Sequence, residues 1–592
     1  MRKLIQILCT LTLCWVFGGT LLASQDPAMM SISEIHPGMK GYGRTVFSGG
    51  KIERFEFEIL GLLNNVMGPG RNLILVRASG GPLADTGIVA GMSGSPCYID
   101  GRLVGALSIG FPFEKEPIGG ITPIGEMLEQ LKELPEATSS RTPLILPRVD
   151  TPKILKAALQ GQMIPLTEIM GDMGTTLPGG GEILPLAVSG IGSSPEIKAL
   201  WAGLPMRFMA GGGSAGTSHG EASPLEPGGM VSINLLQGDW NYSASGTITY
   251  VSGKKLLLFG HQFMNFGAVD LPMWSTTVAA VLSKYDSSEK LATPVAPIGA
   301  LRLDRSVGVA GILGADAKMV PFRIGLDLGG KKNLNFRFEL MDHPFLTPRL
   351  AATVLLQTLS SHIRGQGLQS LSLQGNIKIV GHPAIQLECM VADLSASRLA
   401  QYLGGMVQAV TLNPFERPLI EGLSITVKAE ERLDLTGIAG VRVLKARVKR
   451  GSTLPVLVTL QNIQGVRETA TFNVNVPAAA RPGKATLLVG DGMSLVNSDP
   501  DERAIDVSSM EDMVRMLNGA LRNNHIYSLL VQSLPGAGLR GARIEGIPPT
   551  VSSLLGSDGD GSNRLQRQII GRAILPLERE VQGLVSLDLE IE

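Results

Sequence analysis

Cysteine is scarce, with 4 residues in a chain of 592. Cys9 and Cys14 lie within the first 23 residues, which leaves Cys97 and Cys389 for the remainder of the chain. Two cysteines do not make the disulfide framework of a small secreted domain. The sequence leaves open whether Cys97 and Cys389 pair or stay free.

An excess of either charge is also missing, because Lys+Arg and Asp+Glu both number 52. A balanced chain has no global field to attract nucleic acid or anionic lipid, so we expect no nucleic-acid partner. The 7 histidines show no His-Glu-x-x-His pattern and no other metal-ligand spacing. We therefore expect neither a metal nor a cofactor.

Long apolar runs are absent except at the start of the chain. Arg2 and Lys3 precede an uncharged run from Leu4 to Ala23, in which Gly18-Gly19 interrupts the helical character. A charged start, an apolar centre and a small-residue end are typical of a secretory signal peptide. The competing reading is an uncleaved anchor. We expect cleavage and an exported protein, which is periplasmic, on the cell surface or extracellular.

The remaining pattern is mainly β. Aromatic residues make up only 5% of the chain and glycine numbers 73, which suits many short strands and turns. Phe55–Ile59 alternates as a half-buried strand should, and Val231–Leu236 is another strand. Thr122-Pro123 is expected to open a helix, with Thr122 as its N-cap. A chain of this length needs several cores. The expected division is a signal peptide (1–23), a serine-bearing half (30–135), a linker with a small α/β insertion (136–224), a histidine-bearing half (225–320), an α+β region (321–435) and an immunoglobulin-like β-sandwich with a terminal α/β extension (436–592).

The first stretch with chemical potential is Gly87–Pro96, in which Ser93 stands between Gly91 and Gly94. Small residues around a serine let backbone N–H groups face a substrate oxygen, as in an oxyanion hole. The following Asp100-Gly101 suits a two-residue type I′ hairpin turn, since both central residues need a positive φ. The plain alternative is that these glycines only make a tight turn.

The second stretch is Gly260–Gly267, where His261 follows an apolar strand. A histidine in this position could be a general base, and it could equally be a satisfied structural histidine. For one histidine in isolation the structural reading is the safer one.

The two stretches together resemble the SpoIVB sporulation peptidase family. Gly87–Pro96, with the hairpin and the segment 119–128, is similar to its serine block. Residues 246–261 are similar to its histidine block, and Asp304–Gly308 resembles a segment that follows. The resemblance implies a chymotrypsin-like double β-barrel serine peptidase, assembled here from two segments, that acts on exported or membrane-associated proteins.

The chain departs from that family in two respects. Ser93 precedes His261, as if the domain were permuted; geometry and not chain order defines such sites, so catalysis is still allowed. The family's aspartate before the nucleophile has no counterpart in Arg77–Pro82. The candidates for a third carboxylate are Asp85, Asp270 and Asp304.

The expected function is an exported serine endopeptidase that cleaves a protein or peptide substrate. Ser93 is the nucleophile, His261 is the general base, and the N–H groups of Gly91 and Ser93 hold the oxyanion. Ser95 is less suited because Pro96 follows it directly. The alternative is a catalytically silent exported scaffold or binding protein with a peptidase-like fold. Association with envelope proteins fits either function, and the oligomeric state is open.

Overall fold

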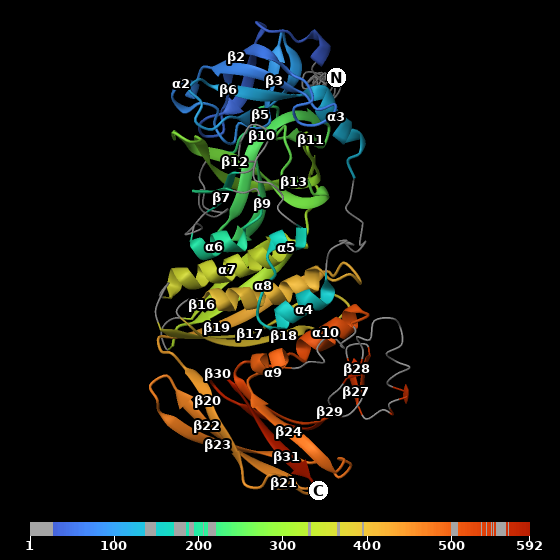
Figure 1. The fold of residues 1–592 in the computed structure, drawn as a ribbon. Helices are drawn as coiled ribbons and strands as arrows, with labels where there is room; N and C mark the ends of the chain where they lie inside the picture. Colours follow the sequence, from blue (N-terminus) through green and yellow to red (C-terminus); the bar gives the residue numbers. More distant parts are fainter. Residues whose placement is uncertain are drawn as a thin grey trace, which may run out of the picture.

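The computed structural model describes residues 28–592 except 136–149, 171–184, 189–193, 205–206, 211–220, 330–332, 364–367, 394–395, 499–506, 534–535, 540–541, 546–547, 549, 552–563 and 566–567. The expected signal peptide and much of the expected linker lie outside the described residues. The described part of the chain is mainly β and stacks along one direction, from the barrel of residues 40–123 to the C-terminal sheets (Figure 1).

The first unit is a closed barrel of six strands in the order β1-β2-β3-β6-β5-β4. Its β4–β5 turn is the expected one, because Asp100 and Gly101 have φ values of 48° and 75°. The short helices η1 (Ile32–Glu34) and α2 (Leu83–Thr86) lie beside it. The strands are β1 Lys40–Val46, β2 Ile52–Leu63, β3 Leu73–Ser79, β4 Ser95–Ile99, β5 Arg102–Gly110 and β6 Ile118–Pro123.

A second ring of six strands follows in the chain, paired in the order β9-β12-β13-β14-β11-β10 and closed by the β9–β10 pairing. Unlike the first barrel, this ring is part of a larger sheet of 13 strands. Its strands are β9 Met230–Gly238, β10 Tyr242–Ser252, β11 Lys255–Leu258, β12 Gly267–Leu282, β13 Glu289–Arg305 and β14 Gly308–Leu313.

The two rings pack against each other around a shared apolar cluster. Tyr98 and Leu103 from the barrel join Tyr250 and Leu257 from the second ring in this cluster. Helix α3 (Ile124–Lys132) contributes Met127 to the same cluster. The segments before residue 135 and after residue 225 are therefore in direct contact.

The expectation that Thr122 caps α3 is wrong. The N-cap is Pro123, which makes no side-chain capping bond. The Thr122 hydroxyl is instead buried between the rings, where it donates to the Gly260 carbonyl at 2.7 Å. Because the Thr122 hydroxyl is hydrogen-bonded to another segment, it does not cap the helix that follows it.

The middle of the chain extends the sheet of the second ring. Strand β16 pairs with β9, and the sheet continues in the order β16-β15-β19-β17-β18. Helices α7 and α8 lie along these strands in Figure 1, and their apolar residues share one core with the sheet. At the other edge the sheet continues from β10 to β7 and β8. The elements are β7 Pro185–Val188, β8 Arg207–Ala210, β15 Met319–Asp327, β16 Leu334–Met341, β17 Gln369–Ile379, β18 Ile385–Asp393, β19 Ile420–Glu430, α4 Thr151–Leu159, α5 Leu166–Met170, α6 Pro195–Leu200, α7 Leu346–His362 and α8 Ser397–Thr411.

The C-terminal region contains a four-stranded sheet in the order β23-β22-β20-β30 and a five-stranded sheet in the order β21-β31-β24-β25-β29. Both sheets contribute to one apolar core. A small three-stranded sheet, β27-β26-β28, and two helices accompany them. The elements are β20 Leu435–Val443, β21 Arg447–Val448, β22 Thr453–Asn462, β23 Arg467–Asn475, β24 Gly483–Gly490, β25 His525–Gln532, β26 Gly536–Leu539, β27 Ala542–Glu545, β28 Arg564–Leu565, β29 Gln568–Pro576, β30 Glu580–Gln582, β31 Leu584–Ile591, α9 Gly492–Ser498 and α10 Met510–Asn518.

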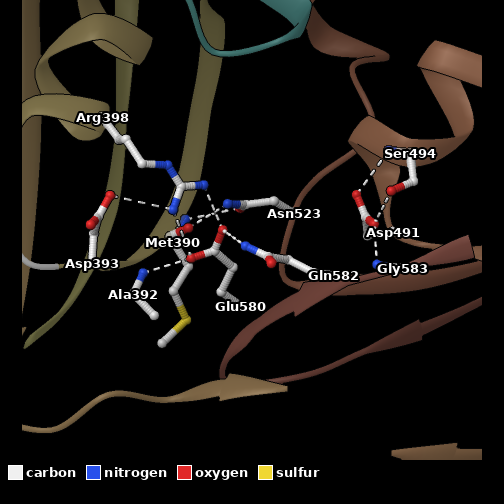
Figure 2. Close-up of polar contacts among 10 residues, drawn as sticks. All are labelled: Met390, Ala392, Asp393, Arg398, Asp491, Ser494, Asn523, Glu580, Gln582 and Gly583. Carbon is white, nitrogen blue, oxygen red and sulfur yellow. Dashed lines mark hydrogen bonds and ion pairs between the residues drawn. The ribbon is translucent and has the colours of Figure 1, made fainter. Parts of the chain in front are cut away.

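A polar joint connects these C-terminal sheets to the sheet above them (Figure 2). The Glu580 carboxylate accepts from the Arg398 guanidinium at 2.6 Å and from the Ala392 amide at 2.7 Å. Glu580 is 1% exposed, so the pair is shielded from water on the carboxylate side. Contacts of this kind fix the two regions relative to each other.

Cys97 and Cys389, whose pairing the sequence left open, are both free and buried. Burial raises the pKa of both thiols, so neither is a reactive thiolate at neutral pH. Within the described ranges, no helix has the length and apolar content that a membrane span requires.

Candidate functional site

Ser93 lies in the loop between α2 and β4, at the side of the first barrel that faces the second ring. The loop turns at Gly91 and Gly94, whose φ values are +96° and +95°. A Cβ added at Gly94 would lie 2.0 Å from the Thr247 carbonyl oxygen, so only glycine fits there. Ser93 itself is half-buried and accepts a bond from the Thr247 amide at 2.8 Å. The glycines therefore serve both the turn and the close approach of the second ring.

The backbone amides of this loop alternate between paired and unpaired. The Met92 N–H donates to Val89 at 2.9 Å and the Gly94 N–H donates to Leu107 at 2.7 Å. The N–H groups of Gly91 and Ser93 donate to no acceptor among the residues that the structure describes. Two unpaired donors two residues apart are what a pair of oxyanion donors requires.

His261 follows β11 in a turn made by Phe259 and Gly260, both with positive φ. The imidazole is 5% exposed and stacks on the Phe259 ring with 5.9 Å between centroids. Its Nδ1 lies 2.6 Å from the Gln262 carbonyl oxygen. A carbonyl only accepts, so Nδ1 carries the proton and Nε2 keeps its lone pair. Burial lowers the pKa of His261, which favours the neutral form that a general base needs.

Ser93 and His261 line the same cavity, which has a volume of about 600 Å³. The cavity wall also includes the β5–β6 loop and the loop between β12 and β13. No hydrogen bond joins the Ser93 hydroxyl to the His261 ring, although both residues are described. Catalytic hydrogen bonds in unliganded enzymes are often long and tighten on substrate binding.

Comparison with protein families places one part of the chain. Residues 22–127 match the family model of SpoIVB peptidase S55. The match confirms the resemblance that the serine block carries, and it includes Ser93 and its flanking glycines. His261 lies outside it. No curated protein and no solved structure matches the chain. The peptidase S55 match supports the assignment of the chain as a peptidase and does not identify its catalytic residues.

None of the candidate carboxylates contacts the His261 ring. Asp85 is exposed at the edge of the cavity. Asp270 forms an ion pair with Arg302. Asp304 is fully buried, and its two oxygens accept from three backbone amides of the loop that follows His261. Burial raises the pKa of the Asp304 carboxyl, and the amide bonds oppose that rise. The Gln262 carbonyl thus takes the place on Nδ1 that an aspartate has in a peptidase triad.

Ser95 is fully buried, and its hydroxyl donates to the Met92 carbonyl at 2.6 Å. This bond and that of the Ser95 amide to the same oxygen, at 2.9 Å, fix the peptide group that carries the Ser93 N–H. Ser95 supports the loop and is not presented to a substrate.

Two further residues of the site have no signal in the sequence. Glu114 reaches from the β5–β6 loop and accepts from the Ile88 amide at 2.8 Å. Lys290, on β13, is buried with its ammonium against the Gly91 carbonyl at 3.2 Å. Both contact the loop that carries Ser93 through long-range packing that no local pattern reveals. In the described ranges, no group of three or more His, Cys, Asp or Glu residues is placed so that it could hold a metal ion.

Proposed function

We propose that the chain is an exported serine endopeptidase that cleaves protein or peptide substrates through an acyl-enzyme. The observation that carries this proposal is the shared cavity of Ser93 and His261. The peptidase S55 match over the serine block supports it independently. We further propose that the two six-stranded rings are a chymotrypsin-like double barrel with its halves in permuted order, one carrying the nucleophile and the other the base.

The proposed reaction starts when Ser93 Oγ attacks the scissile carbonyl carbon and His261 Nε2 takes the hydroxyl proton. A neutral hydroxyl is too weak a nucleophile without such a base. The negative oxygen of the tetrahedral intermediate accepts from the N–H groups of Gly91 and Ser93. Each good donor of this kind contributes about 3–4 kcal/mol to the transition state. Collapse breaks the C–N bond, His261 returns the proton to the leaving amine, and water hydrolyses the acyl-enzyme by the same route.

The Gln262 carbonyl holds the Nδ1–H and so fixes the tautomer and the orientation of the ring. It carries no negative charge, so it stabilises the imidazolium less than a carboxylate does. Loss of the orienting aspartate costs about 10⁴ in rate where an enzyme depends on it. We therefore expect a slow peptidase.

A second candidate function is a silent exported scaffold with a peptidase-like fold. Among the described residues, no carboxylate contacts the His261 ring and no bond joins Ser93 to His261, and both observations favour the scaffold. Envelope proteins are the expected partners of either form.

Cleavage separates the two functions. We expect the purified protein to cleave casein or itself, and Ser93→Ala to abolish this. His261→Ala is expected to lower the rate nearly as much, because residues that act as a unit have non-additive effects. Ser95→Ala is the matched control: it loses the hydroxyl bond to the Met92 carbonyl but keeps the Ser95 amide bond to the same oxygen, so it should lower the rate without abolishing cleavage. Folded wild-type protein that cleaves nothing, as circular dichroism would establish, favours the scaffold.

A further inference from the structure

Lys290 is a buried lysine that the proposed mechanism does not use. It lies on β13, is 3% exposed, and its Nζ donates to Thr45 Oγ1 at 2.8 Å and to the Gly91 carbonyl at 3.2 Å. Nζ also contacts the Met230 sulfur at 3.5 Å and lies over the Phe47 ring, 5.8 Å from its centroid. No carboxylate among the described residues pairs with it. Burial lowers the pKa of Lys290 to about 7.

A lysine without a counter-charge is expensive to bury in its charged form, and an apolar side chain of the same length would cost less free energy. Perturbed, unpaired ionisable groups cluster at functional sites. Lys290 also packs directly against the loop of the candidate site, because a Cβ added at Gly91 would lie 3.2 Å from the Lys290 Cδ.

The contacts fix both peptide groups that flank Gly91. The Lys290 amide donates to the Ala90 carbonyl at 3.1 Å. In a planar trans peptide the C=O and N–H point in opposite directions, so this bond directs the Gly91 N–H away from β13. The next peptide is held through its Gly91 carbonyl, which accepts from Lys290 Nζ and, at 3.0 Å, from Thr247 Oγ1.

We infer that Lys290 is a positioning residue for oxyanion binding. Its side chain holds the Gly91–Met92 peptide group, which connects the peptide groups that carry the unpaired N–H groups of Gly91 and Ser93, and so keeps these two donors directed at one oxygen. This inference rests on the proposed function. A glycine with φ of +96° is free to rotate in ways other residues are not, so its orientation needs outside support.

The test is Lys290→Met, with Thr45→Val as the matched control. The methionine fills similar space and keeps the backbone bond to Ala90, but it loses the bond to the Gly91 carbonyl. Thr45→Val removes the other oxygen partner of the ammonium and leaves the Gly91 contact in place. Removal of one oxyanion donor lowers kcat by about 10²–10³. Lys290→Met leaves the donors in the chain but no longer holds them in place, so it should lower kcat by about 10- to 100-fold.

Three readouts are measured on both variants: kcat and KM for cleavage, the thermal unfolding temperature, and hydrogen exchange of the peptide containing Gly91. For Lys290→Met we expect kcat to fall with KM unchanged, the unfolding temperature to stay equal or rise, and exchange of the hydrogen-bonded Ala90 and Met92 amides in that peptide to accelerate. Thr45→Val should leave kcat within about twofold, since the Gly91 contact survives. A purely structural lysine would instead lower the unfolding temperature.

The inference is overturned if Lys290→Met leaves both kcat and exchange at the wild-type level, or if Thr45→Val has the same effect as Lys290→Met. It is also overturned if the loss lies in KM alone. A wild type that is folded but neither cleaves nor reacts refutes the proposed function instead. In that case the exchange measurement still decides whether Lys290 orders the Gly91 peptide groups.

Discussion

Replacement of Asp304 tests how the His261 loop is held. Asp304 Oδ1 accepts from the Phe263 amide at 2.7 Å, and Oδ2 accepts from Met264 at 2.8 Å and Phe266 at 3.1 Å. Asp304→Asn can keep its amide oxygen at the Oδ2 position and so retain the bonds from Met264 and Phe266. Its NH2 group then faces the Phe263 N–H, and two donors cannot form a hydrogen bond. Asp304→Ala loses all three.

The magnitudes follow from these bonds. A hydrogen bond to a charged group contributes about 1.5–3 kcal/mol. Asp304→Asn should therefore destabilise the loop by about 2 kcal/mol, and Asp304→Ala by roughly 5 kcal/mol or more. Losses of the second size approach the whole stability of a typical domain. Activity should fall with the stability of the loop, because Asp304 acts on its backbone and does not touch the imidazole.

The assay combines thermal unfolding with the rate of fluorophosphonate labelling of Ser93, measured well below the transition. Asp270→Asn is the control, since it removes the ion-pair partner of buried Arg302 without a contact to the His261 loop. It should lower stability and leave the labelling rate unchanged. If Asp304→Asn lost about 10⁴ in rate at unchanged stability, Asp304 would be a catalytic carboxylate and the reasoning would be refuted.

Three further predictions concern other parts of the chain. Burial lowers the pKa of His261, and the base acts when neutral, so kcat/KM should be lost on acidification only below the usual histidine value of about 6.5; a limb above that value would contradict the assignment. N-terminal sequencing of exported material should begin shortly after Ala23, and exported protein that retains Met1 would refute cleavage. Glu580→Gln should lower the thermal unfolding temperature and should leave Ser93 labelling unchanged; the free energy of unfolding should fall by about 3 kcal/mol at most, because Arg398 is partly exposed, and an unaffected transition would refute a stabilising joint.

Local features of the fold could be predicted from the sequence. The hairpin turn at Asp100-Gly101 depends only on residues that tolerate positive φ, and α10 begins after Ser509, whose hydroxyl accepts from the Asp512 amide as a serine N-cap does. Thr122 was wrongly predicted as a cap because its partner, Gly260, is far away in the chain. Side-chain competition of this kind is decided by tertiary packing.

The site was predictable only in part, for the same reason. Ser93 and His261 stand in glycine-rich turns that mark where a backbone comes close to another segment. The role of Asp304 depends on three loop amides, and the role of Lys290 on the pairing of β13 with the Ser93 loop through Ala90. Strand pairing over such distances leaves no periodicity in the sequence. The free state of Cys97 and Cys389 is likewise a result of where the fold places them.

The central claim is that Ser93 is a nucleophile activated by His261. It is tested most directly by mass spectrometry of the protein after treatment with a fluorophosphonate. The account predicts one adduct, on the peptide that contains Ser93, with none at Ser95 in the same peptide. The adduct should be absent from Ser93→Ala and strongly slowed in His261→Ala. Folded wild-type protein without an adduct on Ser93, or equal labelling of wild type and His261→Ala, would contradict the claim.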